Sequence, residues 1–234
     1  MIAVGHQPNY LPYLGFFAKI AAGDVFVIVD NVQYVKRGPF GWQNRNKIRN
    51  HDGWQWLTVP VLTRGKYHQN INEARINNRE HWRGKHWRSI EYNYHNAPFF
   101  DRYADFFKSV YEQEWEMLCN LNITLIRYLL DQLGIDVPVQ IASQEEIDGE
   151  GTGLIVDICR KTGADTYLHG EHGGDYADFE AIEAAGIDNL VQTYHHPTYP
   201  QCFDGFESHM SVIDLLFNCG PDSYDILVGG NEIK

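Results

Sequence analysis

The sequence has few of the features that mark exported or membrane-embedded proteins. Its four cysteines, Cys119, Cys159, Cys202 and Cys219, are far apart and include no C-x-x-C pair, which argues against a zinc ribbon and a disulfide framework. No apolar run approaches the roughly 18 residues of a membrane span, and the N-terminus lacks the charged and then apolar pattern of a signal peptide. We therefore expect reduced thiols, no membrane span and a cytoplasmic location.

Positive charge is scarce and unevenly distributed. The chain has 19 Lys and Arg against 31 Asp and Glu, a net charge of −12. Residues 36–88 nevertheless hold 12 of those cations and only three acids, an excess of +9, so the remainder carries −21. Such a segment is expected to face phosphate or carboxylate groups, because guanidinium groups match both in geometry. The alternative is an ordinary solvated surface.

What the chain does have is enough apolar sequence for one large domain. Of its 234 residues, 44% are hydrophobic and 14% aromatic. Residues 2–4 and 25–30 predict strands on either side of a helix at 14–22, and the second strand is a continuous apolar run typical of parallel sheets. We therefore predict an α/β fold, a Rossmann-like parallel sheet with helices on both faces. Ligands of such sheets bind at the carboxyl ends of the strands.

The middle of the chain predicts an insertion. Residues 44–50 and 54–62 have the pattern of two strands around an Asp-Gly turn, and residues 71–76 resemble a third strand. Helices are expected at 81–94, 99–111 and 115–133. We therefore describe residues 1–234 as a single α/β domain, with a basic, aromatic-rich insertion at 38–96 and a helical segment at 98–134.

The last third returns to alternating strands and helices. We expect strands at 137–142, 165–168 and 189–194, and helices at 153–161, 175–185 and 212–218. Ser211 is the expected N-cap of the last helix. This βαβ order again indicates a parallel sheet.

A first polar cluster follows the first predicted strand. It contains His6, Gln7, Asn9 and Tyr10, in a turn that prolines stiffen. A stiff turn at a strand end suits side chains that must hold a ligand without rearranging. The amides could instead satisfy turn backbone groups.

Two further clusters lie in and near the insertion. Lys36, Arg37 and Arg45 suit phosphate groups, Trp42 or Tyr34 suits a base or sugar ring, and Gln43 and Asn44 are amides in the same stretch. A similar group, Lys85, His86 and Arg88, falls on a predicted helix. We expect both clusters to bind substrate or nucleotide.

Two clusters follow later strands. In the first, His169, Gly170, Asp175 and Tyr176 lie in a strand-to-helix turn, where glycine permits close approach and helix N–H groups suit an anion. In the second, His195 also leaves a predicted strand. The spacing of these side chains fits no specific metal motif, so we predict no metal and assign acid or base chemistry to neutral His.

Many blocks of the sequence resemble the WbqC-like protein family. They span nearly the whole chain and include HQPNYLPYLGFFAKI, DVFVIVDNVQYVKR, WQNRN, KHWRSI, GADTYLHG, HHPTYPQ and SVIDLLFNCGP. The resemblance implies a place beside enzymes that build bacterial O-antigens and other surface polysaccharides. The residues that match family motifs are His6, Gln7, Pro8, Tyr10, Pro12, Trp42, Gln43, Asn44, Arg45, Lys85, His86, Trp87 and Arg88. One departure is His169-Gly170, where the resemblance leads us to expect Ser-Gly.

The layout is also similar to pantothenate synthetase and related HIGH-motif nucleotidyltransferases. Those enzymes bind ATP above such a sheet, so the likeness implies ATP with Mg²⁺ as a cofactor. The chain has no H-x-G-H motif, and only His6 and Asn9 stand where it would be. A polar turn after the first strand is common to many Rossmann-like folds.

We therefore predict an enzyme, a transferase or an ATP-dependent amide-forming ligase. It would modify a nucleotide-activated sugar or a similar small anionic substrate in O-antigen biosynthesis, by ligation or by acyl or aminoacyl transfer to an amine. His6 and Asn9 would polarise phosphate, and His169 or His195 would move the proton. The alternative is a non-catalytic module that binds glycan or nucleic acid through residues 36–88, although the acidic remainder disfavours a long polyanion.

Overall fold

The computed structural model describes residues 1–36 and 41–234. The strands are β1 Ile2–His6, β2 Val25–Ile28, β3 Arg45–Asn50, β4 Gly53–Thr58, β5 Val139–Ile141, β6 Thr166–His169, β7 Asp188–Tyr194 and β8 Asn231–Ile233. The helices are α1 Leu14–Ala21, α2 Trp82–Tyr94, α3 Phe100–Glu112, α4 Leu118–Leu133, α5 Gly151–Thr162, α6 Phe179–Ala184, α7 Val212–Cys219 and α8 Ser223–Val228. Short 3₁₀ turns are η1 Ile71–Glu73, η2 Gly173–Asp175 and η3 Gly220–Asp222.

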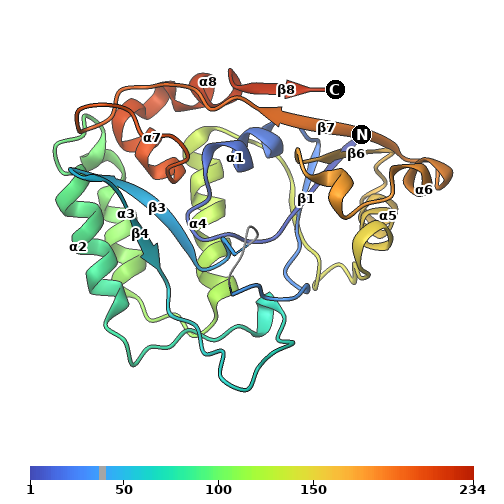
Figure 1. The fold of residues 1–234 in the computed structure, drawn as a ribbon, viewed down its shortest axis with the longest axis horizontal. Helices are drawn as coiled ribbons and strands as arrows, with labels where there is room; N and C mark the ends of the chain where they lie inside the picture. The colour runs from blue at the N-terminus through green and yellow to red at the C-terminus, as the bar shows by residue number, and fades with distance from the viewer. Residues whose placement is uncertain (37–40) are drawn as a thin grey trace.

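A mostly parallel sheet organises these elements (Figure 1). Its strand order is β5-β2-β1-β6-β7-β8, with β8 antiparallel at one edge. A separate antiparallel hairpin, β3–β4, stands beside α2 at the opposite side of the view from α5 and α6. The predicted α/β class is therefore confirmed.

Apolar side chains cover both faces of the sheet, which explains the continuous apolar run of β2. Side chains of a parallel strand alternate between faces. Val4 and Phe26 join the larger core, which contains α1 and α4, whereas Ala3 and Val27 join a smaller core under α5. All four residues of β2 are buried. Helices therefore lie on both faces, as predicted.

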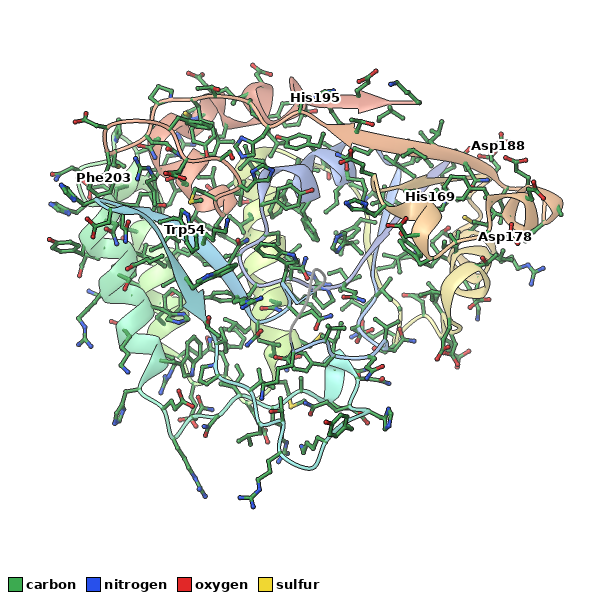
Figure 2. The ribbon with its side chains drawn as sticks, in the orientation of Figure 1. Trp54, His169, Asp178, Asp188, His195 and Phe203 are labelled. Carbon is green, nitrogen blue, oxygen red and sulfur yellow. The ribbon has the colours of Figure 1, made fainter. Side chains whose placement is uncertain are left out.

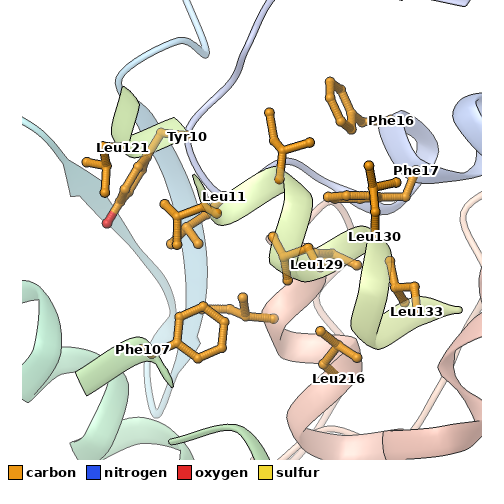
Figure 3. Close-up of a cluster of buried hydrophobic side chains, with 14 of the residues drawn as sticks. Tyr10, Leu11, Phe16, Phe17, Phe107, Leu121, Leu129, Leu130, Leu133 and Leu216 are labelled. Carbon is orange, nitrogen blue, oxygen red and sulfur yellow. The ribbon is translucent and has the colours of Figure 1, made fainter. Parts of the chain in front are cut away.

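Helix α4 forms the centre of the larger core. Figure 3 shows Leu129, Leu130 and Leu133 of α4 among Phe17 and Leu216, which come from α1 and α7. The helix ends at Gly134, whose φ of 71° is the left-handed conformation that glycine adopts without strain. Within the described residues, no helix combines the length and apolar character needed to cross a membrane.

Some elements differ from the sequence prediction. Residues 71–76 do not form a strand: Asn70 and Glu73 cap a 3₁₀ turn, and only isolated bridges follow at Arg75 and Ile76. Helix α6 begins at Phe179 rather than near 175, because the Asp178 carboxylate accepts the Ala181 N–H as an N-cap. The expected Ser211 cap of α7 is confirmed. Helix α8 and strand β8 were not predicted.

A buried carboxylate on α7 connects the segment after β7 to α2 and, through Gln201, to the hairpin. Asp214 accepts hydrogen bonds from Tyr94 (2.9 Å), Tyr199 (2.9 Å) and Gln201 (2.7 Å). Burial raises the pKa of this carboxyl, while the hydrogen bonds from Tyr199 and Tyr94 oppose the rise. The Nε of Arg49, on β3, donates to Oε1 of Gln201 at 3.2 Å. Residues 199–214 are therefore held in one place against β3.

Replacing Asp214 with Asn should destabilise the fold moderately. The amide nitrogen cannot accept from a tyrosine hydroxyl, so one of the three donors loses a strong acceptor. We expect a loss of about 1–2 kcal/mol, which in a chain of this size lowers the melting temperature by about 2–8 °C. Asp225→Asn, at an exposed position of α8, is the control. Equal melting temperatures for both variants in calorimetry would show that Asp214 does not stabilise the fold.

Candidate functional site

The order in which the chain adds strands to the sheet reverses between β1 and β6. The chain runs from β1 to β2 on one side and from β6 to β7 on the other. Strands β1 and β6 pair only at Ile2–Thr166 and Ala3–Tyr167, whereas β1 pairs with β2 as far as His6–Ile28. The carboxyl ends of β1 and β6 therefore separate at this topological switch point, where open α/β sheets bind ligands.

A buried lysine fills part of that gap. Lys19, on α1, is 6% exposed, and its Nζ donates to the Gly5 carbonyl at 3.2 Å. The carbonyl of His6 accepts the N–H of Val29, directly after β2. Because carbonyl directions alternate along a strand, the Gly5 carbonyl faces β6. Among the described residues, no carboxylate lies within ion-pair distance of Lys19. Burial lowers the pKa of this ammonium to about 8.

His6 ends β1 with a defined tautomer. Its Nδ1 lies 2.9 Å from the Gln7 carbonyl, which can only accept, so Nδ1 carries the proton. The ring packs edge-to-face on Phe16, with the centroids 4.7 Å apart. Burial, followed by the charge of Lys19, lowers the pKa of His6 to about 3. His6 is therefore neutral at pH 7, and Nε2 is its basic nitrogen.

His169 ends β6, and its ring packs on Tyr167 and Phe179, on the face of the sheet that α5 and α6 cover. Its Nε2 lies 2.8 Å from Oδ1 of Asn189, whose amide nitrogen donates to Phe179 O, so Nε2 carries the proton. Nδ1 is buried and has no hydrogen-bond partner among the residues that the structure describes. Burial lowers the pKa of this imidazole, and the charge of Lys19 acts in the same direction. The ring is fully covered, with Gly173 packed against it.

Amide side chains tie the turn after β1 to the insertion. Nε2 of Gln43 donates to Oε1 of Gln7 at 2.5 Å, and Oε1 of Gln43 accepts the Val35 N–H at 2.7 Å. From α4, Asn122 donates to the carbonyls of Pro8 (2.8 Å) and Gln43 (2.7 Å). We call His6, Gln7, Lys19 and Gln43 the rim site.

Tyr10 and His86, predicted to bind ligand, lie in the core. The Tyr10 hydroxyl is 2.8 Å from Nδ1 of His86 and also contacts the Tyr111 hydroxyl. Burial lowers the pKa of His86 to about 4. These contacts join α2 and α3 to the turn after β1. Tyr10 and His86 therefore hold this turn in position from inside the core.

The other residues of the insertion that were predicted to bind ligand lie at different places within it. Asn44 is 8% exposed and donates to the Val59 carbonyl at 2.8 Å. Lys36 is exposed and donates to Thr63 Oγ1 at 3.0 Å, and Asn9 is half-buried. Arg45 is the first residue of β3, and the Trp42 ring packs against Trp56 of β4 with centroids 5.6 Å apart. The prediction for Arg37 falls outside the described residues.

Lys85 and Arg88 face a different surface. They line an open groove of about 1050 Å³ between α2 and the hairpin turn, together with His51 and Tyr92. None of the rim-site residues lines this groove. We therefore do not assign the groove to the rim site.

The remaining predicted residues lie after β6 and β7. The carbonyl of Gly170 accepts the N–H of Gly173, and Tyr176 is 52% exposed. Asp175 lies 3.5 Å from an imidazole nitrogen of His172 in the exposed turn. Nε2 of His195 lies 3.1 Å from a carboxylate oxygen of Glu232 in β8. The structure thus places Lys19 beside His6, whereas the His169 ring lies on the opposite face of the sheet and His195 lies beside β8.

Sequence reasoning missed Lys19. The only available signal was one cation within the apolar helix FFAKIA, which the amphipathic pattern assigned to the core. Among the described residues, no three His, Cys, Asp or Glu side chains are grouped to hold a metal ion.

Mild acid should destabilise the fold through its neutral histidines. In the unfolded chain His titrates near 6.5, whereas folded His6 and His86 titrate at about 3 and about 4. The unfolded state therefore binds more protons below pH 6.5, and their stabilising contribution, complete above that value, is lost as pH falls toward the folded pKa. From pH 6.5 to 5.5 we expect about 1 kcal/mol lost per histidine, less for partly exposed His6.

Urea titrations at those two pH values measure this loss. His6→Asn removes the His6 contribution and should make the change smaller than in the native chain. His172→Asn, at an exposed position, should leave it unaltered. A native free energy of unfolding that does not change between the two pH values would contradict the assigned protonation states.

These features define an α/β protein whose candidate site lies at the switch point of a Rossmann-like sheet. The chain belongs to the WbqC-like protein family, whose pattern matches residues 7–226. It is also 35% identical, over 94% of its length and 95% of the relative's, to an uncharacterized protein of Mycobacterium tuberculosis (strain ATCC 25618 / H37Rv). No solved structure matches the chain.

Proposed function

We propose that the chain is an enzyme of surface-polysaccharide biosynthesis that modifies a small anionic substrate, such as a nucleotide-activated sugar, at the rim site. Membership of the WbqC-like family, which is associated with O-antigen synthesis, supports the pathway. The observation that carries the site is Lys19, a buried cation beside the neutral imidazole of His6 at the switch point.

A buried ammonium without a carboxylate partner is costly for the fold. Removing a charge from water costs several kcal/mol unless it is paired. A phosphate or carboxylate of the substrate would supply the missing partner through charge-assisted hydrogen bonds. The substrate would therefore restore a charge balance that the protein alone lacks.

His6 suits the proton transfer. Its Nε2 is unprotonated, and a bound anion raises the pKa of a neighbouring imidazole. In acyl or aminoacyl transfer, an acceptor amine attacks the acyl carbon, the amide bond forms as the bond to the leaving group breaks, and the amine proton passes to Nε2. Lys19 would balance the charge of the leaving group. If ATP is used, it would activate the acyl group, with Mg²⁺ carried on its phosphates.

A ligand screen tests this function. ATP, CTP, UDP-glucose and dTDP-glucose are added separately, and the melting temperature is recorded. We expect one nucleotide or nucleotide-sugar to raise it, and release of phosphate or pyrophosphate once an amine acceptor is present. If none of the four raised the melting temperature at millimolar concentration, the rim site would not be a nucleotide-sugar site.

A further inference from the structure

The β3–β4 hairpin carries a row of cations and indole rings on one face. The antiparallel register places Lys47 opposite Trp56 and Arg49 opposite Trp54. Alternation along β3 puts Arg45 on the same face, while Ile48 and Leu57 point into the core. We call Arg45, Lys47, Trp54 and Trp56 the indole ladder.

The ladder residues are in contact with one another and with solvent. Arg45 lies 4.6 Å over the Trp56 ring, and Lys47 lies 4.6 Å over the Trp54 ring. The two indoles meet edge-to-face with centroids 5.6 Å apart. Trp54 and Trp56 are nevertheless 42% and 38% exposed. Large exposed aromatic groups that are clustered, rather than scattered, mark interaction sites.

Within the part of the chain that the structure describes, no carboxylate neutralises the charges of the ladder. Among the described residues, neither Arg45 nor Lys47 has a carboxylate within ion-pair distance, although the chain has 31 acids and a net charge of −12. One guanidinium N–H of Arg45 is used on the Gly41 carbonyl, at 3.2 Å from Nε. Its terminal nitrogens form no ion pair with any acid in residues 1–36 and 41–234. The complementary ligand is therefore anionic.

We propose that the indole ladder is a binding site for an acidic saccharide. Sugar rings present a flat face of C–H groups that packs on indole, and their carboxylate groups would meet Arg45 and Lys47. Successive nucleobases stack parallel to one another, whereas Trp54 and Trp56 are inclined at 82°. Sugars rotate about their glycosidic bonds and can follow perpendicular rings. The −21 charge outside residues 36–88 also opposes a long nucleic acid.

The position of the ladder fits an extended ligand. Figure 2 shows Trp54 well separated from His169. At the other end of β3, the Trp42 carbonyl accepts the Tyr10 N–H, and Gln43 joins Gln7 of the rim site. The ladder therefore starts beside the rim site and leads away from it. The proposal rests on the hairpin and holds whatever chemistry the rim site performs.

Calorimetry and tryptophan fluorescence test the proposal with defined probes. Tetragalacturonate is the acidic saccharide, maltotetraose the neutral one and tetrathymidylate the oligonucleotide. We expect tetragalacturonate to bind and change the fluorescence, and the other two to bind at least about tenfold more weakly. Trp54→Ala and Lys47→Met should each weaken tetragalacturonate binding about tenfold, the loss of one stacking or charged contact.

Matched controls separate the ladder from the rest of the surface. Tyr92→Ala and Lys85→Met remove an exposed aromatic and a cation from the groove beside α2, and should leave binding unchanged. His6→Asn should also leave it unchanged, which distinguishes the ladder from the rim site. The proposal is overturned if tetragalacturonate fails to bind, if Lys47→Met with a native melting temperature binds it normally, or if tetrathymidylate binds more tightly.

Discussion

Replacing Lys19 with Met is expected to stabilise the fold and to weaken anion binding at the same time. Met keeps the length and the apolar stem of Lys but removes a buried charge. Exchange of buried charges for apolar groups of similar volume is neutral or stabilising by about 1–4 kcal/mol. In a chain of this size, each kcal/mol raises the melting temperature by about 2–4 °C. A residue kept only for packing would not show this gain.

The binding free energy lost in Lys19→Met should be larger than the contribution of an ordinary hydrogen bond. A hydrogen bond to a charged group contributes about 1.5–3 kcal/mol, which corresponds to about 10–150-fold in affinity. Calorimetric titration of the nucleotide identified in the screen measures it. Lys161→Met, at an exposed position on α5, is the control and should change neither quantity.

The pH dependence of binding identifies Lys19 as the responsible group. Because its pKa is lowered to about 8, the free site loses its positive charge as pH rises through that value. Affinity for the anion should therefore decrease between pH 7 and 9 and be coupled to proton uptake, since a bound anion raises the pKa. Lys19→Met should bind weakly at both pH values. An unchanged affinity in Lys19→Met would remove Lys19 from the site.

The positions of the main elements follow from local sequence, and this explains why they were predicted. The continuous apolar run of β2 needs cover on both faces, so it indicates a parallel sheet before any contact is known. The glycines after α4 and α5 adopt φ values of 71° and 75°, which few other residues tolerate. Residues 71–76 were misread because their apolar spacing fits a strand, whereas the capping pair at Asn70 and Glu73 closes a turn.

The partners of a polar side chain could not be predicted, because they come from distant segments. Tyr10 and His86 match a ligand-binding pattern as well as any residue in the chain, yet Tyr111 and His86 occupy the Tyr10 hydroxyl. Lys19 shows the opposite case. Its helix has the pattern of a core helix, and its role depends on where β1 and β6 stop pairing, which no local pattern encodes.

Replacing His6 with Asn should abolish most of the turnover while leaving substrate binding nearly intact. The Asn amide can still donate to the Gln7 carbonyl, as Nδ1 does, but it has no basic nitrogen in place of Nε2. General base catalysis by a positioned side chain contributes about 10²–10⁴-fold. We therefore expect kcat to fall by about that factor and KM to change little.

Steady-state kinetics with the substrate pair found in the screen separates catalysis from positioning. His172→Asn, an exposed imidazole, is the control and should retain native kcat. Added imidazole should restore part of the activity of His6→Asn, because it can replace the missing base at the partly exposed ring position. A native kcat with a raised KM would instead mean that His6 holds the substrate and that another group accepts the proton. That outcome would leave Lys19 as the anion partner and require a different base at the rim site.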